Sequence, residues 1–284
     1  MALSEAAPVA DVLDALADSA PEIRAGFAGR HEKLDEQNAT GDQQLHADVH
    51  ADDLLRGRFE RLDAVGQYAS EECEYAHDVG GGPLSVAVDP LDGSSNLATN
   101  NPTGTIVGIY DAPLPAGGDS LVAAAYVLYG PMTTMVVARD GRLTRSYVTE
   151  DGRVDEEDVA LPDDPAIYGF GGRVPDWTDD FATYARAVED ELKLRYSGAM
   201  VADVNQIVQK GGVFAYPGLE GRPEGKLRTQ FEGIPMAYVL ECAGGASTDG
   251  ERSLLDAEPE SLHERTPVYL GSTEYVARAE RALD

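Results

Sequence analysis

The sequence predicts a mixed α/β or α+β protein, because helical and strand patterns occur in both halves of the chain. In the first sixty residues, apolar side chains recur at helical spacing. From about residue 84 the pattern changes to short runs rich in β-branched residues, which are separated by Gly, Pro and Asp turns. The pattern predicts these elements but not the order of the strands.

The first half is expected to hold two helical stretches and then a run of strands. The residues at helical spacing are Val9, Val12, Leu13 and Leu16, and then Leu45, Val49, Leu54 and Leu55. The predicted strands are 84–88, 105–110, 121–128 and 132–138, with a hairpin turn at Asp140-Gly141.

The acidic, proline-bearing stretch 150–165 is the best candidate for a boundary, which divides the chain into domains 1–160 and 161–284. The elements predicted after it are a strand at 166–170, helices at 181–192 and 199–209, a strand at 212–216, and a helix at 235–243. Pro235 falls in the first turn of that last helix, where proline is tolerated.

The charge balance is strongly acidic. The chain has 51 Asp and Glu against 22 Lys and Arg, a net charge of −29, and only four of the bases are lysine. Such a surface disfavours nucleic acid and anionic membranes as partners. Abundant acid with scarce lysine is typical of a cytoplasmic protein from a salt-accumulating halophile. At about molar salt the Debye length is roughly 3 Å, so self-repulsion is screened. Circular dichroism is therefore expected to show unfolding when salt is dialysed away without divalent metal.

The most informative segment is Val86-Ala87-Val88-Asp89-Pro90-Leu91-Asp92-Gly93-Ser94-Ser95-Asn96. An apolar strand delivers two carboxylates three residues apart, and small residues with free amides and hydroxyls follow. Mg²⁺ prefers oxygen ligands and shares them with substrate phosphate, while the amides suit a phosphoryl oxygen. The alternative is that Asp-Pro and Asp-Gly only mark turns. The whole octapeptide Asp89–Asn96 favours the metal and phosphate interpretation.

Asp89-Pro90-Leu91-Asp92-Gly93-Ser94-Ser95-Asn96 resembles the signature of the class I fructose-1,6-bisphosphatases, whose superfamily includes the inositol monophosphatases. Further segments match in the family's order between about residues 38 and 275. They are Thr40-Gly41-Asp42-Gln43 with Asp48, Ser70-Glu71-Glu72, Arg195 to Val204, Gly225-Lys226-Leu227-Arg228, and Glu232 to Val239. The resemblance implies a layered α-β-α-β-α sugar-phosphatase fold with two subdomains and a site between them.

The resemblance also implies residue roles around two or three Mg²⁺ ions, with Mn²⁺ as a possible substitute. The implied metal ligands are Glu71, Asp89, Asp92, Glu232 and the Leu91 carbonyl, with Asp42 supporting a third, weaker position. Asp48 and Glu72 would orient and deprotonate the attacking water. The implied reaction is hydrolysis of the 1-phosphate of fructose 1,6-bisphosphate in gluconeogenesis.

The resemblance also implies which residues contact the substrate. Asp92, Gly93, Ser94 and Ser95 would hold the scissile phosphate and the neighbouring sugar oxygen. Tyr196, Tyr216 and Lys226 would bind the distal phosphate or the sugar, and Arg228 is a further base close to Lys226. Arg195 resembles an arginine that reaches into a neighbouring subunit's site, which implies a homo-oligomer, a dimer or a tetramer.

Two segments depart from the family's pattern. Where relatives carry Asn-Glu-Gly-Tyr, with Asn and Tyr on the 6-phosphate, this chain has Gly171-Gly172-Arg173-Val174. We expect Arg173 to compensate, directly or across an interface. The positions aligned with an AMP site are Pro83, Leu84 and Asp111, so AMP inhibition through that site is not expected.

Two rival functions stay open. One is a related phosphatase acting on sedoheptulose bisphosphate, inositol phosphate or a nucleotide phosphate, and the other is a catalytically silent metal- and phosphate-binding regulator. Other chemistry-bearing residues have plain interpretations. His46 and His50 are expected on an exposed helix face, Cys73 as a small buried apolar group, and Trp177 in packing.

Overall fold

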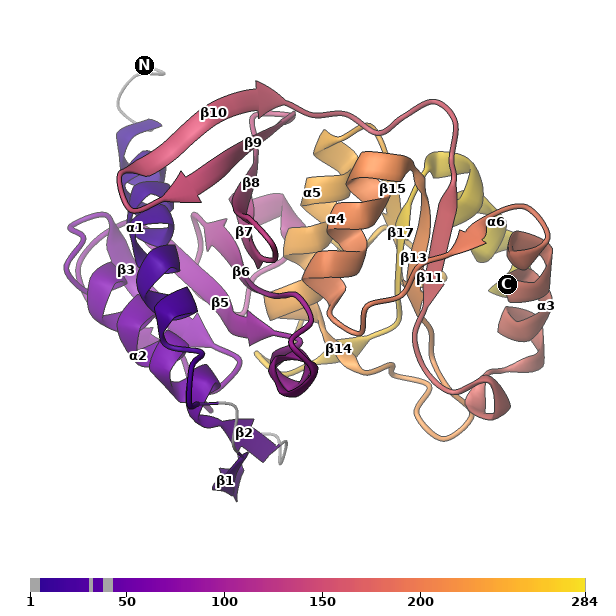
Figure 1. Ribbon diagram of the computed structural model, residues 1–284, viewed down its shortest axis with the longest axis horizontal. Coiled ribbons are helices and arrows are strands. Elements are labelled where there is room, and N and C mark those ends of the chain that lie inside the picture. Colours follow the sequence, from indigo (N-terminus) through magenta and orange to yellow (C-terminus); the bar gives the residue numbers. More distant parts are fainter. Residues whose placement is uncertain (1–5, 31–32, 38–42, 284) are drawn as a thin grey trace.

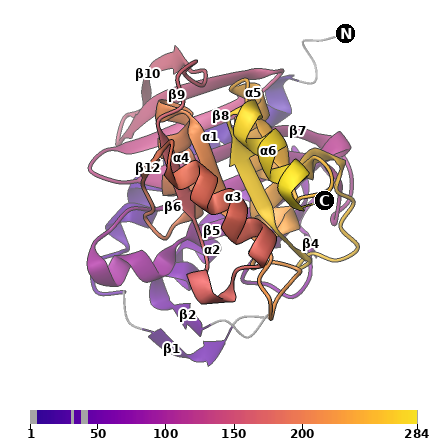
Figure 2. The same cartoon turned by 90° about the vertical axis from the view of Figure 1, so that its right-hand side faces the viewer.

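The computed structural model describes residues 6–30, 33–37 and 43–283, and it has five layers in which helix pairs alternate with two β-sheets (Figure 1). Helices α1 and α2 cover one face of the first sheet, α4 and α5 lie between the sheets, and α3 and α6 cover the far side (Figures 1 and 2). This arrangement confirms the expected layered α-β-α-β-α fold. The helices are α1 (Ala6–Ala25), α2 (His46–Phe59), α3 (Asp179–Glu189), α4 (Met200–Lys210), α5 (Ile234–Cys242) and α6 (Thr273–Leu283).

The first sheet has eight strands in the order β10-β9-β8-β7-β6-β5-β3-β4. All neighbours are antiparallel except the parallel pair β3 and β5. The bounds are β3 (Val65–Ser70), β4 (His77–Asp78), β5 (Leu84–Asp92), β6 (Thr103–Tyr110), β7 (Leu121–Tyr129), β8 (Thr133–Arg139), β9 (Arg142–Thr149) and β10 (Gly152–Asp158). Every residue of β5 is buried because helices cover both faces there, which explains its nearly continuous apolar run.

The second sheet has five strands in the order β12-β11-β13-β17-β15. Strand β11 runs parallel to β12 and β13, and β17 runs antiparallel to β13 and β15. The bounds are β11 (Ile167–Phe170), β12 (Lys193–Leu194), β13 (Gly212–Tyr216), β15 (Ala246–Thr248) and β17 (Val268–Gly271). Two small sheets complete the fold: β1 (Lys33–Gln37) with β2 (Gln43–Leu45), and β14 (Leu227–Arg228) with β16 (Arg265–Thr266).

The hydrophobic core has three parts, one on each side of the first sheet and one outside the second. The central part joins α4 and α5 to strands of both sheets, with Ile106, Val201, Phe214 and Leu240 among its fully buried members. Helix α5 is apolar on nearly all sides because it is enclosed between the sheets. The outer part is aromatic, and Trp177 packs there edge-to-face on Phe181, which confirms its expected packing role.

The sequence patterns located most of these elements but missed several. The first sixty residues were expected to be helical, whereas β1 and β2 lie between α1 and α2. Within the candidate boundary stretch 150–165, strand β10 occupies 152–158 and pairs with β9 at the sheet edge. Its acidic side chains are exposed there, so strand pairing and solvation are compatible. Strands β3, β15 and β17 and helix α6 were not predicted.

The division at residue 160 stays a prediction, although β10 ends at Asp158 and β11 begins at Ile167. None of the helices in the described ranges combines the length and apolar character that crossing a membrane requires.

Candidate active site

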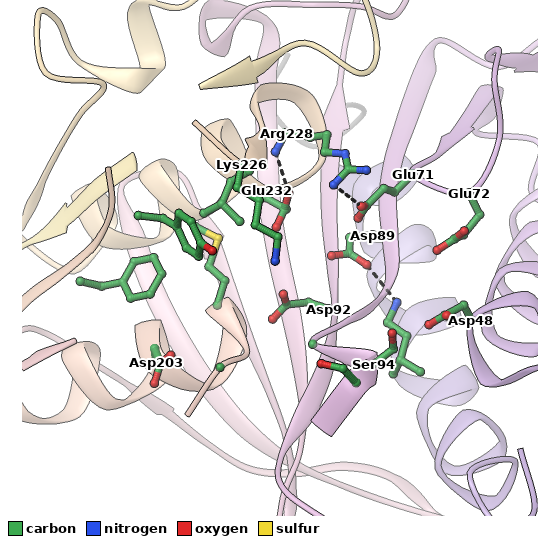
Figure 3. Close-up of a pocket in the computed structure, with 18 of the residues that line it drawn as sticks. Asp48, Glu71, Glu72, Asp89, Asp92, Ser94, Asp203, Lys226, Arg228 and Glu232 are labelled. Carbon is green, nitrogen blue, oxygen red and sulfur yellow. Dashed lines mark hydrogen bonds and ion pairs between the residues drawn. The ribbon is translucent and has the colours of Figure 1, made fainter. Parts of the chain in front are cut away.

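A cavity of about 320 Å³ opens between the two halves of the chain. Its walls come from the end of β5, the 3₁₀ helix η1 (Ser94–Thr99), the start of α4, the end of β13, and the segment from β14 into the π-helical turn η4 (Thr229–Gly233). Figure 3 shows that acidic side chains from both halves of the chain point into this space.

The turn that ends β5 brings its carboxylates and the following small residues to the cavity. The Leu91 amide donates to Asp89 Oδ1 at 3.0 Å, which fixes the bend at Pro90. Gly93 then adopts a left-handed conformation, with φ of 70°, and a Cβ at this position would overlap the side chain of Ala199. Glycine is therefore required for the chain to pass under α4 and to present Ser94 and Ser95 to the cavity.

Three buried carboxylates form the centre of the site. Oxygen atoms of Asp89, Asp92 and Glu232 all lie within 4.8 Å of one another. Burial, followed by repulsion from neighbouring carboxylates, raises the pKa of Asp92 to about 7 and that of Glu232 to about 8. The same two causes raise the pKa of Asp89 well above its ordinary range.

Backbone amides and one arginine hold these carboxylates in place. The Val201 amide donates to Asp92 Oδ2 at 2.6 Å, and the Arg228 amide donates to Glu232 Oε2 at 2.6 Å. The Arg228 guanidinium forms an ion pair with Glu71 at 2.9 Å (Figure 3). One residue, which is itself almost fully buried, thus connects a carboxylate of the first half with one of the second half.

The donor set fits a hard divalent cation. Oxygen atoms alone converge at the centre, and Mg²⁺ and Mn²⁺ prefer carboxylate and carbonyl oxygens over thiolate or imidazole. Repulsion among these acids disfavours their ionised forms, and a bound cation reverses that effect. The acidic group at Asp89, Asp92 and Glu232 is therefore able to hold a metal ion.

Asp48 and Glu72 lie on the Asp89 side of the cavity (Figure 3). Asp48 is in the first turn of α2 and accepts a hydrogen bond from the Leu45 amide at 2.7 Å. Burial is the main cause that raises its pKa to about 6. The Glu72 amide donates to the Ser70 hydroxyl at 3.2 Å, at the point where β3 ends.

The opposite end of the cavity is lined by Tyr196, Tyr216 and Lys226. The Lys226 ammonium lies 5.5 Å from the centre of the Tyr216 ring. A Cβ atom at Gly171 would overlap that ring, so this glycine provides the space in which Tyr216 packs. The departure from the family's pattern at Gly171 thus has a local packing reason.

The structure brings together most of the residues singled out in the sequence. The predicted residues that line the cavity are Asp48, Glu71, Glu72, Asp89, Leu91, Asp92, Gly93, Ser94, Ser95, Tyr196, Tyr216, Lys226 and Glu232. Asp42 lies outside the described residues. Arg195 is exposed and does not line the cavity of its own chain.

Two arginines that the sequence suggested as phosphate ligands are placed differently in the structure. Arg228 does line the cavity, but its guanidinium is paired with Glu71, so its charge is directed at the acidic group. Arg173 does not line the cavity; its side chain is 81% exposed, and its Nε lies 4.0 Å from Asp176. Direct compensation by Arg173 within one chain is therefore not supported.

Sequence reasoning missed two residues that shape the cavity. Asp203 of α4 lines it and accepts from the Ser197 amide at 2.7 Å, and burial raises its pKa to about 6. From the other side, the Asn96 side chain donates to the Ser197 carbonyl at 3.1 Å. Both fix the segment that presents Tyr196. The available signal was a charged residue at 203 among the apolar positions of a predicted helix.

Comparison with known proteins identifies the family. The family model described as fructose-1-6-bisphosphatase, N-terminal domain, matches residues 23–151, and the corresponding C-terminal domain matches residues 161–284. A class 1 fructose-1,6-bisphosphatase of Natronomonas pharaonis is 57% identical over 96% of this chain and 98% of its own length. One from Halobacterium salinarum is 59% identical over 96% of both chains.

Solved structures agree with this result. Leishmania major fructose-1,6-bisphosphatase in holo form superposes with a TM-score of 0.91 at 27% identity, covering 98% of this chain and 94% of the other. A putative sedoheptulose-1,7 bisphosphatase from Toxoplasma gondii has a TM-score of 0.87 at 29% identity, covering 97% and 94%. The chain belongs to the class 1 fructose-1,6-bisphosphatase family.

Proposed function

We propose that this protein is a Mg²⁺-dependent phosphatase that hydrolyses the 1-phosphate of fructose 1,6-bisphosphate, giving fructose 6-phosphate and phosphate in gluconeogenesis. The observation that carries the proposal is the convergence of acids from five separated segments on one cavity that also holds a lysine. Relatives at 57–59% identity bear the name of this activity. The acidic composition and the substrate class favour the cytoplasm as its location.

In this proposal two or three Mg²⁺ ions, or Mn²⁺ in their place, are held by Glu71, Asp89, Asp92, Glu232 and the Leu91 carbonyl. Asp42, which lies outside the described residues, would support a third, weaker position. When bound, such ions polarise the phosphoester and stabilise charge on the attacking and leaving oxygens. The protein's part is to keep its acids converged against their own repulsion. The Val201 and Arg228 amides do this by donating to Asp92 and Glu232.

Asp48 and Glu72 orient the attacking water and accept its proton. Both carboxylates lie on the Asp89 side of the cavity, and Lys226 lies on the other side of Asp89 (Figure 3). The pKa of Asp48, about 6, leaves this carboxyl largely ionised at neutral pH while keeping it basic enough to take a proton.

The scissile phosphate is held by Asp92, Gly93, Ser94 and Ser95, whose backbone amides and hydroxyls follow the turn at the end of β5. The distal phosphate and the sugar contact Tyr196, Tyr216 and Lys226. Among the described lining residues, Lys226 is the base not engaged with Glu71, and one ammonium leaves a dianionic phosphate partly uncompensated.

Arg195 fits the role of a base supplied to a neighbouring subunit. It is exposed, it lies beside the cavity residue Tyr196, and Leu194 next to it is an exposed apolar residue. A homo-oligomer, either a dimer or a tetramer, would thus complete the distal end of each site. Mixing an Arg195→Ala chain with an Asp89→Asn chain tests this, because partial activity is expected only in mixed oligomers.

Phosphate release in about molar KCl, with Mg²⁺ or with a chelator, tests the activity. We expect release from fructose 1,6-bisphosphate, little from fructose 6-phosphate, and none with the chelator. Sedoheptulose 1,7-bisphosphate and inositol 1-phosphate belong in the same panel. The first is a specific alternative because of the Toxoplasma gondii structure and the altered segment 171–174. No release from any substrate would contradict the proposal and favour a silent regulator.

A further inference from the structure

The loop after β3, which carries Glu71 and Glu72, is held through the residue that follows them, Cys73. On the main-chain side, His263 Nε2 lies 2.8 Å from the Cys73 carbonyl oxygen. A carbonyl oxygen only accepts hydrogen bonds, so Nε2 carries the proton and donates. His263 is 190 residues away in the sequence, so this bond ties the two halves of the chain together.

The surroundings of His263 hold its ring in place but give one of its two ring nitrogens no hydrogen-bond partner. Its Nδ1 atom is buried and has no hydrogen-bond partner among the described residues. The ring packs against Phe231, with ring centres 5.5 Å apart, and Phe231 directly precedes the acid Glu232. Burying an unpaired ring nitrogen is unfavourable, so the single bond to Cys73 is maintained against that penalty.

The turn that bears His263 is itself attached to the acidic group. The Thr229 amide donates to the Glu264 carbonyl at 2.8 Å, and strand β16 pairs with β14, which ends at Arg228. His263, Arg228 and Glu232 therefore belong to one hydrogen-bonded unit of the second half.

On its other side Cys73 faces helix α2. Its thiol lies 3.8 Å from Asp52 Oδ2, and Asp52 also accepts from the buried Tyr68 hydroxyl at 2.7 Å. Asp52 is one helical turn beyond Asp48, so the same helix positions a cavity carboxylate and supports the loop. Cys73 is thus held by its side chain from the first half and by its carbonyl from the second half.

We propose that His263 is a positioning residue, which keeps the Glu71-Glu72 loop at the distance from Glu232 that shared cation binding requires. It acts through the Cys73 carbonyl, because His263 itself does not line the cavity. This inference rests on the proposed function, since it assigns to the cavity acids the metal-binding role stated above. Residues that orient metal ligands typically contribute about 10–100-fold to metal affinity.

The test measures Mn²⁺ binding by the full-length protein without substrate, from the loss of the free-ion electron paramagnetic resonance signal in about molar KCl. His263→Leu and His263→Met remove the donor, and His263→Gln keeps an N–H near the position of Nε2. We expect the Leu and Met variants to bind Mn²⁺ about tenfold more weakly, and the Gln variant to recover most of the affinity.

Tyr184→Phe is the matched control. The Tyr184 hydroxyl is buried and donates to the Tyr275 carbonyl at 3.0 Å, so this variant also removes a side-chain bond to a main-chain carbonyl, but far from the cavity. We expect it to lower the melting temperature and leave Mn²⁺ affinity unchanged.

Wild-type Mn²⁺ affinity in folded Leu and Met variants would overturn the proposal. It would also be overturned if both variants failed to fold, because His263 would then be a general structural residue, or if the Gln variant recovered nothing. Since the readout needs no turnover, it stands apart from the test of function. A wild-type protein that binds Mn²⁺ but releases no phosphate would contradict the proposed activity alone.

Discussion

The two ends of the cavity are built in different ways. The acidic end is formed around the buried carboxylates Asp89, Asp92 and Glu232. These come from separated segments, and main-chain amides and Arg228 hold the acidic side chains in place. At the distal end, Tyr196 is partly exposed, Lys226 contacts the ring of Tyr216, and the nearby arginines Arg195 and Arg173 do not line the cavity.

The difference shows which end of the cavity a single chain can complete and which end it leaves incomplete. If the proposed metal ligands are right, the acidic end contains all of them together with the Arg228 countercharge and the amides that hold them, so a single subunit supplies that part of the site. The distal end has one ammonium and two phenols, so under the proposed function few contacts there would hold the second phosphate and select the substrate. Substitutions at the two ends should accordingly affect different kinetic constants.

The largest effect is expected at the acidic end. Asp89→Asn or Glu232→Gln removes a proposed ligand, and because outer-shell substitutions alone cost about 10–100-fold, activity should fall more than about 100-fold. Phosphate release at saturating Mg²⁺ measures it. Asp53→Asn, an exposed acid on α2, is the charge-matched control and should stay near wild type. More than a tenth of the activity remaining would mean that these acids do not hold the metal.

At the distal end, Lys226→Met should raise KM for fructose 1,6-bisphosphate by roughly tenfold, the usual value of a hydrogen bond to a charged group, with little change in kcat. Steady-state kinetics separate the two constants. Lys193→Met on the exposed strand β12 serves as the control. A fall in kcat at constant KM would assign Lys226 to the acidic end instead.

The acidic end should also make stability depend on pH when metal is chelated. The pKa values of Asp92 and Glu232 rise from 3.8 and 4.5 to about 7 and 8, so the folded state binds more protons than the unfolded chain within that window. The free energy of unfolding therefore falls as pH rises from about 5 to about 8. Melting temperatures in EDTA should drop by several degrees, less so in Glu232→Gln, and Mg²⁺ should remove the drop. A flat profile in EDTA would contradict the raised pKa values.

The smallest effect is expected from Arg173→Ala. Its guanidinium is exposed, so any contribution across an interface should change KM for the bisphosphate only about two- to fivefold. KM for a sugar 1-monophosphate should change less, because the distal phosphate is missing. Arg186→Ala, on the exposed face of α3, controls for the lost charge. Equal changes for both substrates would reject a role of Arg173 at the distal phosphate.

Elements with strong local patterns were predictable, and those fixed by distant contacts were not. Strand β5 was found because its apolar run ends at Asp-Pro and Asp-Gly turns. Strand β3 was missed because Gly66 and Gln67 interrupt its apolar pattern, and its place beside β5 comes from parallel pairing. The order of eight strands depends on such long-range pairing, which no local window contains.

The same rule applies to the site. The turn from Asp89 to Ser95 was predictable because one short segment supplies its carboxylates, amides and hydroxyls. The pairing of Arg228 with Glu71 was not, because it joins residues far apart in the chain, and an arginine in a phosphatase motif suggests a phosphate contact first. In the sequence, Gly171 only indicated that a family contact to the substrate was missing. The structure shows that a residue without a side chain is needed there to make room for the ring of Tyr216.

Arg228 contacts two acids, Glu71 through its guanidinium and Glu232 through its amide, and this affects how a metal ion would bind. If Glu71 is a metal ligand as proposed, a cation that approaches it would compete with the Arg228 guanidinium, while the amide of the same arginine keeps Glu232 in place. This competition would lower metal occupancy and speed metal exchange, because the arriving ion would have to displace the positive charge of Arg228. Under the proposed function, the rate of catalysis would then follow the concentration of free Mg²⁺ in the cell rather than stay constant.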